Sequence, residues 1–155
     1  GSDPRNISLK LLKKLNKEKI KHNIILLVGR AYRYFQNLKK INKQKNIEIK
    51  YFSRKLFFSS KLAFTSFGLS SFELINNKVF AFNLSHSENH STKAKFFQMK
   101  FKYSKNLGTF KKINKICFSE IIDNFKNKKI NYPKTLFHNK FELNALKKIK
   151  KIIEN

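Results

Sequence analysis

The feature that most constrains this chain is its net charge of +26 over 155 residues, set by 35 lysines and arginines against 9 acidic residues. Self-repulsion at this charge disfavours a compact free chain, so a polyanion is expected to neutralise it where it works. Nucleic acid suits this better than a membrane surface, because the cations are spread along the chain instead of lying on one amphipathic helix. The charge therefore predicts a nucleic-acid-binding protein.

The apolar content is nevertheless high enough for a folded domain. Hydrophobic residues make up 41% of the chain and 17 residues are phenylalanine, so wholesale disorder is not expected. The single cysteine, Cys117, excludes an intrachain disulfide framework and a cysteine-based zinc site. The longest aliphatic run, Ile24 to Val28, is far shorter than the roughly 20 residues of a membrane-spanning helix, so we expect no membrane span.

The basic residues are 31 lysines and only 4 arginines. Lysine, asparagine, isoleucine and phenylalanine dominate the chain, and all four have codons rich in A and T. This composition is typical of a strongly AT-biased genome, as found in many organelles and some parasites. Many lysines are then products of mutation pressure, whereas an arginine kept against the bias is more informative. If the protein works in an organelle, we expect it to be made there or to be already processed.

Hydrophobic periodicity predicts alternating helices and strands. The expected helices are Ile7–Ile20, Ala31–Lys40, Phe110–Phe125 and Thr135–Ile153. The expected strands are Ile24–Val28, Ile47–Phe58 with a continuation over Lys61–Phe67, a strand or hairpin over Leu69–Phe82 that turns at Asn76-Asn77, and Lys95–Tyr103.

The polar, lysine-free stretch Ser85–Thr92 is the candidate boundary between two parts of the chain. Residues 1–84 are predicted to form an α+β domain, a two-layer α/β sandwich with an antiparallel sheet. Residues 85–155 are predicted to form a basic extension of one strand and two helices. No internal repeat is found.

No residue pattern in the sequence predicts catalysis or a cofactor, and four glycines cannot supply a glycine-rich phosphate loop. His86 and His90 have a zinc-like spacing, but no further ligand lies nearby in the sequence and no metal site is predicted. Cys117 lies on the apolar side of its predicted helix and is expected to be a small core residue. Glu120 and Asp123 could form an acid–base pair, although pairing with lysines is the preferred interpretation.

One segment of the sequence contains an ordered pattern of residues that the overall composition does not explain. The apolar run ending in Gly29-Arg30 is followed by Ile47-Glu48-Ile49 and then by Leu56 to Gly68, which reads Leu-Phe-Phe-Ser-Ser-Lys-Leu-Ala-Phe-Thr-Ser-Phe-Gly. This pattern resembles the C-terminal domain of small-subunit ribosomal protein S three. In that family a strand ending in Ser-Gly-Arg precedes a short helix and a Pro-Leu-x-Thr segment. An Ile-Asp-Tyr stretch, an Ala-x-Thr-x-Tyr-Gly segment and a last strand follow. The match covers about residues 5–76 and places the last strand on Phe72–Asn76.

The sequence departs from the family pattern at several positions. Glu48 stands in place of the proline, Phe57 in place of an aspartate, and Phe58 and Phe67 in place of tyrosines. The family's specific polar contacts are therefore not expected here. The family's N-terminal KH domain, with its Gly-x-x-Gly loop, has no counterpart in the chain. The resemblance implies a split or truncated form, whose missing half a separate chain could supply.

The resemblance implies a structural constituent of the small subunit of an organellar ribosome, expected to be mitochondrial, with no enzymatic activity. It would bind ribosomal RNA in the head of the subunit near the mRNA entrance. The implied partners are small-subunit ribosomal RNA, neighbouring head proteins and mRNA, with no membrane, metal or cofactor. Lysine and arginine would neutralise phosphates and position the protein, with little base readout. The predicted RNA-binding residues are Arg5, Lys10, Lys13, Lys14, Arg30, Arg33, Lys39, Lys40, Lys43, Lys45, Arg54 and Lys55.

Three other functions stay open at this point. The chain could be a different or lineage-specific organellar ribosomal protein, for which the Gly29-to-Gly68 match would be chance. It could be a fragment of an organellar intron-encoded endonuclease or maturase, which would need clustered carboxylates for Mg²⁺, whereas the acidic residues here are scattered. Stronger binding to anionic vesicles than to RNA would instead indicate a basic peripheral membrane protein.

Overall fold

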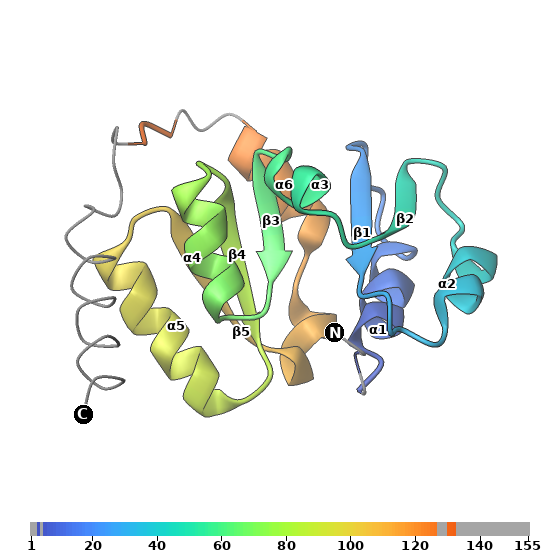
Figure 1. The fold of residues 1–155 in the computed structure, drawn as a ribbon, viewed down its shortest axis with the longest axis horizontal. Coiled ribbons are helices and arrows are strands. Elements are labelled where there is room, and N and C mark those ends of the chain that lie inside the picture. The colour runs from blue at the N-terminus through green and yellow to red at the C-terminus, as the bar shows by residue number, and fades with distance from the viewer. Residues whose placement is uncertain (1–2, 4, 127–129, 133–155) are drawn as a thin grey trace, which may run out of the picture.

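Two sheets of parallel strands form the centre of the structure (Figure 1). The structure is a computed structural model, and it describes residue 3, residues 5–126 and residues 130–132. The first sheet pairs β1 (Ile24–Val28) with β2 (Ile47–Tyr51). The second contains β3 (Leu62–Thr65), β4 (Phe80–Ser85) and β5 (Ser104–Thr109) in that spatial order. Parallel neighbours cannot be joined by a tight turn, so helices connect them.

The first sheet is a β–α–β unit in which α2 (Phe35–Ile41) makes the crossover. In β2, Ile47 and Ile49 are buried while Glu48 and Lys50 are exposed. This alternation is typical of a strand with one covered face. Its buried side chains belong to the same hydrophobic cluster as those of α2.

Helices α4 (Leu69–Asn76) and α5 (Glu88–Lys100) cover one face of the second sheet, as Figure 1 shows. Leu74 from α4, Ala81 from β4 and Phe97 from α5 belong to the hydrophobic cluster packed there. These helices connect β3 to β4 and β4 to β5, so the chain runs in the same direction through all three strands.

The opposite face of the second sheet is aromatic. Successive strand residues point to opposite faces, so Phe82 lies across the sheet from its neighbour Ala81. The rings of Phe64 and Phe82 stack with centroids 5.0 Å apart. Helix α6 (Phe118–Lys126) brings Phe118 against Phe64, with ring centroids 5.1 Å apart.

The larger hydrophobic cluster extends over both sheets. It includes Leu26 of β1 and Leu84 of β4, and it also takes in residues of α1 (Ile7–Leu15) and of the 3₁₀ helix η1 (Phe110–Lys115). The short helix α3 (Arg54–Phe58) connects the two sheets along the chain. Burial of this shared apolar surface is the main favourable term that holds the two sheets together.

The antiparallel sheet predicted from the sequence is wrong, because both sheets are parallel. The segment Lys95–Tyr103, in the predicted extension, is a separate correction, because its alternating apolar residues predicted a strand. Residues up to Lys100 belong to α5 instead. The buried face of α5 contains Ser91, Ala94 and Phe97 at helical spacing, whereas Met99 is 72% exposed.

Two longer predicted strands are also divided in the structure. The strand expected over Ile47–Phe58 ends at Tyr51, and α3 follows before β3 begins at Leu62. The strand or hairpin expected over Leu69–Phe82 is α4 followed by β4. The family's last strand, placed on Phe72–Asn76 by the resemblance, therefore falls inside a helix.

Other expectations agree with the structure. The predicted strand Ile24–Val28 has the bounds of β1. The first two predicted helices exist but are shorter, as α1 and α2. The helix expected over Phe110–Phe125 is divided into η1 and α6. The helix expected over Thr135–Ile153 lies outside the described residues.

The boundary predicted between residues 84 and 85 separates a family-like part from a lineage-specific part, and it stays a prediction. In the structure, strands from both sides of it share one sheet, because β5 pairs with β4. The described part of the 85–155 segment contains α5, β5, η1 and α6.

Candidate nucleic-acid interface

The predicted RNA-binding residues come from four segments of the chain. Arg5 precedes α1, and Lys10, Lys13 and Lys14 lie on it. A second group, Arg30 and Arg33, follows the carboxyl end of β1. Every predicted residue is exposed except Lys14, which is half-buried.

The remaining predicted residues lie elsewhere on the two-sheet core. Lys39 and Lys40 are in the last turn of α2, and the loop that follows leads to the amino end of β2. That loop carries Lys43 and Lys45. Because β1 and β2 are parallel, the four lysines from Lys39 to Lys45 lie near the amino ends of the strands, whereas Arg30 and Arg33 lie near the carboxyl ends. The last pair, Arg54 and Lys55, begins α3. The predicted set therefore does not gather into one patch.

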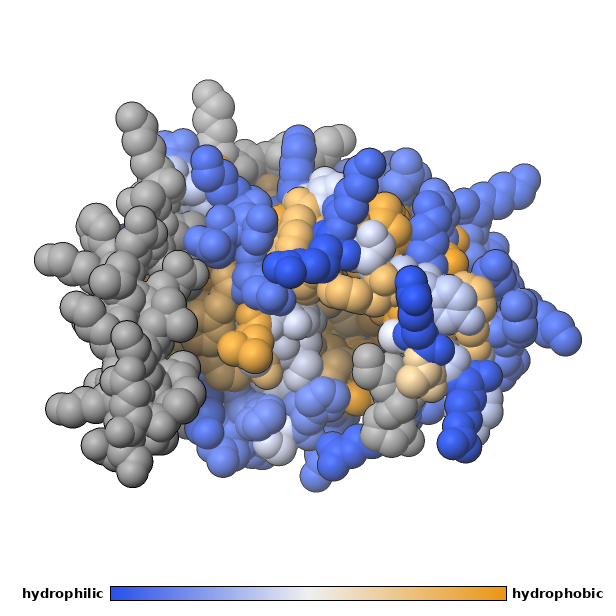
Figure 2. All heavy atoms as spheres, in the orientation of Figure 1, coloured by the Kyte–Doolittle hydropathy of each residue, from blue (hydrophilic) through white to orange (hydrophobic). Residues whose placement is uncertain are grey.

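Few of these cations have acidic partners. Lys14 Nζ lies 3.1 Å from Glu18 Oε1, and Arg54 Nη2 lies 3.7 Å from Glu73 Oε1. Within residues 5–126, the other ten predicted residues form no ion pair. In Figure 2, hydrophilic side chains cover much of the coloured surface, and apolar side chains show between them. Most of the predicted cations thus remain free to meet an external anion.

A cavity opens at the carboxyl ends of strands β4 and β5, next to Arg5. It has a volume of about 270 Å³ and is lined by Arg5, His86, Ser87, Glu88, Thr109 and Lys111. An adjoining cavity of about 210 Å³ shares Arg5, His86 and Lys111 and adds Lys10, Phe110, Ile7 and Ile113. Of these cations, only Arg5 and Lys10 were predicted to bind RNA.

Contacts around His86 define the electrostatics of this cavity. Arg5 Nη1 donates to the backbone carbonyl of His86 at 3.4 Å. Burial lowers the pKa of His86, and the positive charges of Arg5 and His90 lower the pKa further, against a smaller opposing effect of Asp3. The neutral imidazole is therefore favoured, which is the expected state beside cations.

The two carboxylates nearest the cavity are both engaged. Asp3 accepts hydrogen bonds from the backbone N–H groups of Ile7 and Ser8, at 2.9 and 2.7 Å, and so caps α1. Glu88 Oε1 accepts from the hydroxyl of Thr109 at 3.4 Å. The local surplus of charge remains positive.

Polar side chains continue from the cavity edge into the sheet. Ser71 donates to Asn83 Oδ1 at 2.6 Å, and both residues are fully buried. The buried hydroxyl of Ser85, the residue before His86, has no hydrogen-bond partner in the described part of the chain. The carboxyl half of β4 is therefore unusually polar for a central strand. A buried hydroxyl without a partner is also uncommon, because buried polar groups usually form hydrogen bonds.

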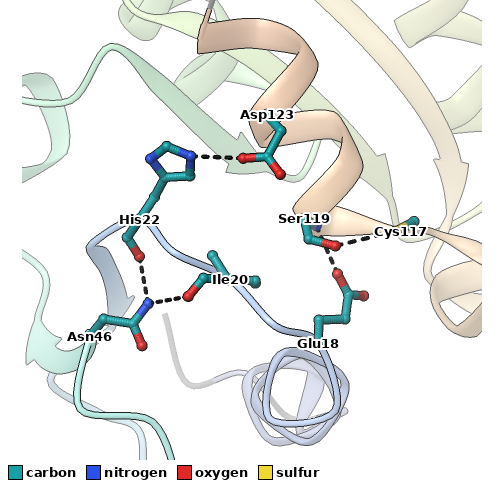
Figure 3. A network of polar contacts seen from close by, with 7 residues as sticks. All are labelled: Glu18, Ile20, His22, Asn46, Cys117, Ser119 and Asp123. Atoms are coloured by element: carbon teal, nitrogen blue, oxygen red, sulfur yellow. Dashed lines mark hydrogen bonds and ion pairs between the residues drawn. The ribbon is translucent and has the colours of Figure 1, made fainter.

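A second polar network joins the segment between α1 and β1 to α6 (Figure 3). His22 Nε2 lies 2.9 Å from Asp123 Oδ1. The amide of Asn46 donates to the backbone carbonyls of Ile20 and His22, both at 2.7 Å. Each of these contacts crosses between separate segments, so the network fixes their packing.

The same region corrects one prediction from the sequence. Cys117, expected in the core, is exposed, and its Sγ lies 3.3 Å from Ser119 Oγ. It falls between η1 and α6, where the predicted helix is interrupted, so it has no place on a buried helical face. The expected partner of Asp123 was a lysine, and the structure gives it His22 instead.

His86 and Ser87 were missed as site residues because Ser85–Thr92 was interpreted as a boundary. Polar residues directly after a buried parallel strand are typical of ligand sites in α/β sheets. That signal existed in the sequence, but using it required β4 to be recognised as a central parallel strand. Lys111 could not be distinguished from the many other lysines.

Within the described residues, no three histidine, cysteine or acidic side chains group closely enough to hold a metal ion. Among the helices of that same part, none combines the length and the apolar character that crossing a bilayer requires. Comparison with protein-family models, with curated proteins and with solved structures finds no match to this chain.

Proposed function

We propose that this protein is a structural RNA-binding constituent of the small subunit of an organellar ribosome, most specifically a mitochondrial one. The observation that carries the proposal is a chain of net charge +26 with a two-sheet core, in whose described residues most of the predicted cations have no acidic partner. Such a surface is suited to phosphate backbones, because each lysine or arginine that meets a phosphate releases counterions.

A narrower form of the proposal places the chain in the head of the subunit near the mRNA entrance, as a counterpart of the S three C-terminal domain. This form rests on the pattern from Gly29 to Gly68 alone. The partners would then be small-subunit ribosomal RNA, neighbouring head proteins, mRNA and a separate chain supplying the N-terminal half.

A second candidate is a different or lineage-specific organellar ribosomal protein. It is favoured by the parallel pairing in both sheets and by helix α4, which occupies the position of the family's last strand. Both candidates share the same chemistry, which is neutralisation of ribosomal RNA phosphates.

The placement of the carboxylates does not favour the endonuclease or maturase alternative. Glu18 and Glu73 are paired with Lys14 and Arg54, and Asp123 is paired with His22. A two-metal nuclease site instead needs carboxylates that converge on the ions.

The test is sedimentation of organelle lysate on sucrose gradients at low and high salt, with mass spectrometry of each fraction. We expect the chain to stay with the small ribosomal subunit after a high-salt wash. A co-sedimenting chain with the KH half would favour the narrower form. Recovery of the chain with intron RNA, with membranes or as free protein would contradict the ribosomal proposal.

A further inference from the structure

Three segments far apart in the sequence meet at the paired cavities. Arg5 comes from the segment before α1, His86 from the loop after β4, and Lys111 from the segment after β5. All three residues line both cavities. The cavities therefore form one continuous depression at the carboxyl edge of a parallel sheet, which is where such sheets bind ligands.

The depression concentrates positive charge. Arg5, Lys10 and Lys111 form no ion pair within residues 5–126, and the nearby carboxylates of Asp3 and Glu88 are engaged in hydrogen bonds to the protein. A hydrogen bond does not neutralise a carboxylate, so Glu88 and Asp3 offset part of the charge of these three cations. The remaining surplus is positive and would attract an anion.

The two cavities differ in polarity. The first has Ser87 and Thr109 in its wall beside the cations, and both residues carry hydroxyl groups. The second is lined by the apolar side chains of Ile7 and Ile113 and by Phe110. The rings of Phe110 and His86 lie 5.4 Å apart. An anionic group beside a flat apolar group is the chemistry of a nucleotide, in which a phosphate adjoins a base that stacks on aromatic rings.

We propose that this depression, defined by Arg5, His86, Phe110 and Lys111, binds one nucleotide of single-stranded RNA, with the phosphate between Arg5 and Lys111 and the base toward Phe110. The inference rests on the proposed function and deepens it, because it assigns one specific phosphate site on a surface that otherwise attracts RNA diffusely. Free phosphate has the same anionic chemistry, so the test includes it as a separate arm.

The experiment measures binding of a short fluorescein-labelled single-stranded RNA by anisotropy, at several salt concentrations. The test variant is Arg5→Gln/Lys111→Gln. The matched control is Lys61→Gln/Lys102→Gln, which removes the same charge from exposed residues at the amino edge of the same sheet. We expect the test variant to lose about tenfold or more in affinity, because charge-assisted contacts to phosphate are lost, and the control to lose clearly less. The slope of log affinity against log salt should become shallower by about 0.7 in the test variant, because the contact to one phosphate is lost.

A second readout follows the ring protons of His86 by NMR, during titration with the RNA and separately with millimolar inorganic phosphate. The RNA should shift the His86 signals in the wild-type chain and not in the test variant. Circular dichroism checks that each variant folds. If the double variant is unfolded, the single variant Lys111→Gln takes its place, since Lys111 is exposed and in no ion pair of the described part.

The outcomes separate this inference from the proposed function. Equal loss of RNA affinity in both variants would overturn the nucleotide site and leave general RNA binding intact. A His86 response to inorganic phosphate without any RNA binding would overturn both the RNA site and the proposed function, and would assign the pocket to a free anion. No response to either probe would overturn both. Loss confined to the test variant supports the site.

Discussion

The carboxylate of Glu18 accepts a hydrogen bond from the backbone N–H of Ser119 at 2.8 Å, across 101 residues of sequence. Ser119 is in the first turn of α6, where backbone N–H groups lack partners within the helix. Glu18 therefore caps α6 from the distant segment after α1, as Figure 3 shows. Lys14 balances its charge, with Nζ 3.1 Å from Oε1.

Replacing this carboxylate should destabilise the protein. We expect Glu18→Ala to lower the free energy of unfolding by about 1–3 kcal/mol, because the cap is lost from a side chain that is nearly buried. Glu18→Gln, which keeps an acceptor for Ser119, should cost less. Urea unfolding followed by circular dichroism measures both. Glu120→Ala, an exposed change in the same helical turn, is the control, and an equal loss there would contradict the capping role.

The end of α4 adopts a backbone conformation that favours glycine but carries a lysine. Lys78 has φ of +60°, its N–H donates to Ile75 O at 3.0 Å, and the next N–H, of Val79, donates to Leu74 O at 2.9 Å. This is the Schellman arrangement that ends many helices. We expect Lys78→Gly to raise the free energy of unfolding by about 0.5–1 kcal/mol by relieving strain. Lys78→Gln, which removes only the charge, should not reproduce the gain in thermal unfolding.

The buried pair Ser71 and Asn83 links α4 to β4 through a polar contact in the core. We expect Ser71→Ala to destabilise by about 1–3 kcal/mol, because it leaves the amide oxygen of Asn83 buried without its donor. Adding Asn83→Leu to that variant should recover part of the loss, since both polar groups are then gone. A double-mutant cycle in denaturant measures the coupling. Additive effects of the two substitutions would show that the pair contributes no coupling.

His86 should make stability depend on pH. Burial, Arg5 and His90 lower the pKa of His86 in the folded protein below its ordinary value of 6.5. As the pH falls through 6.5, the unfolded chain therefore takes up a proton first, and this favours unfolding. The resulting loss in the free energy of unfolding is absent at a pH well above 6.5 and complete at a pH below the lowered pKa of His86.

We expect His86→Asn to reduce the loss of stability between about pH 7.5 and about pH 5, while the other histidines titrate alike in both proteins. NMR titration should also show that Arg5→Gln moves the pKa of His86 upward. A pH profile unchanged by His86→Asn would contradict this account.

The sequence and the structure agree most closely where one segment alone carries the information. A five-residue aliphatic run has the bounds of β1, and the apolar stripe from Ile7 marks α1. They disagree most at α5, where Phe97 and Met99 alternate like strand residues although only Phe97 is buried. Alternation in sequence is ambiguous when several of the apolar residues face solvent.

The sequence by itself determined the charge, the apolar content sufficient for a core and the first elements, because these depend on composition and on local periodicity. Only the tertiary structure decided that the strands are parallel, since this depends on which strands pair and on the helices that cross over between them. It also decided that Arg5, His86 and Lys111 share one depression. Residues separated by more than a hundred positions meet there because the carboxyl ends of parallel strands lie at the same end of their sheet, and no local pattern encodes that meeting.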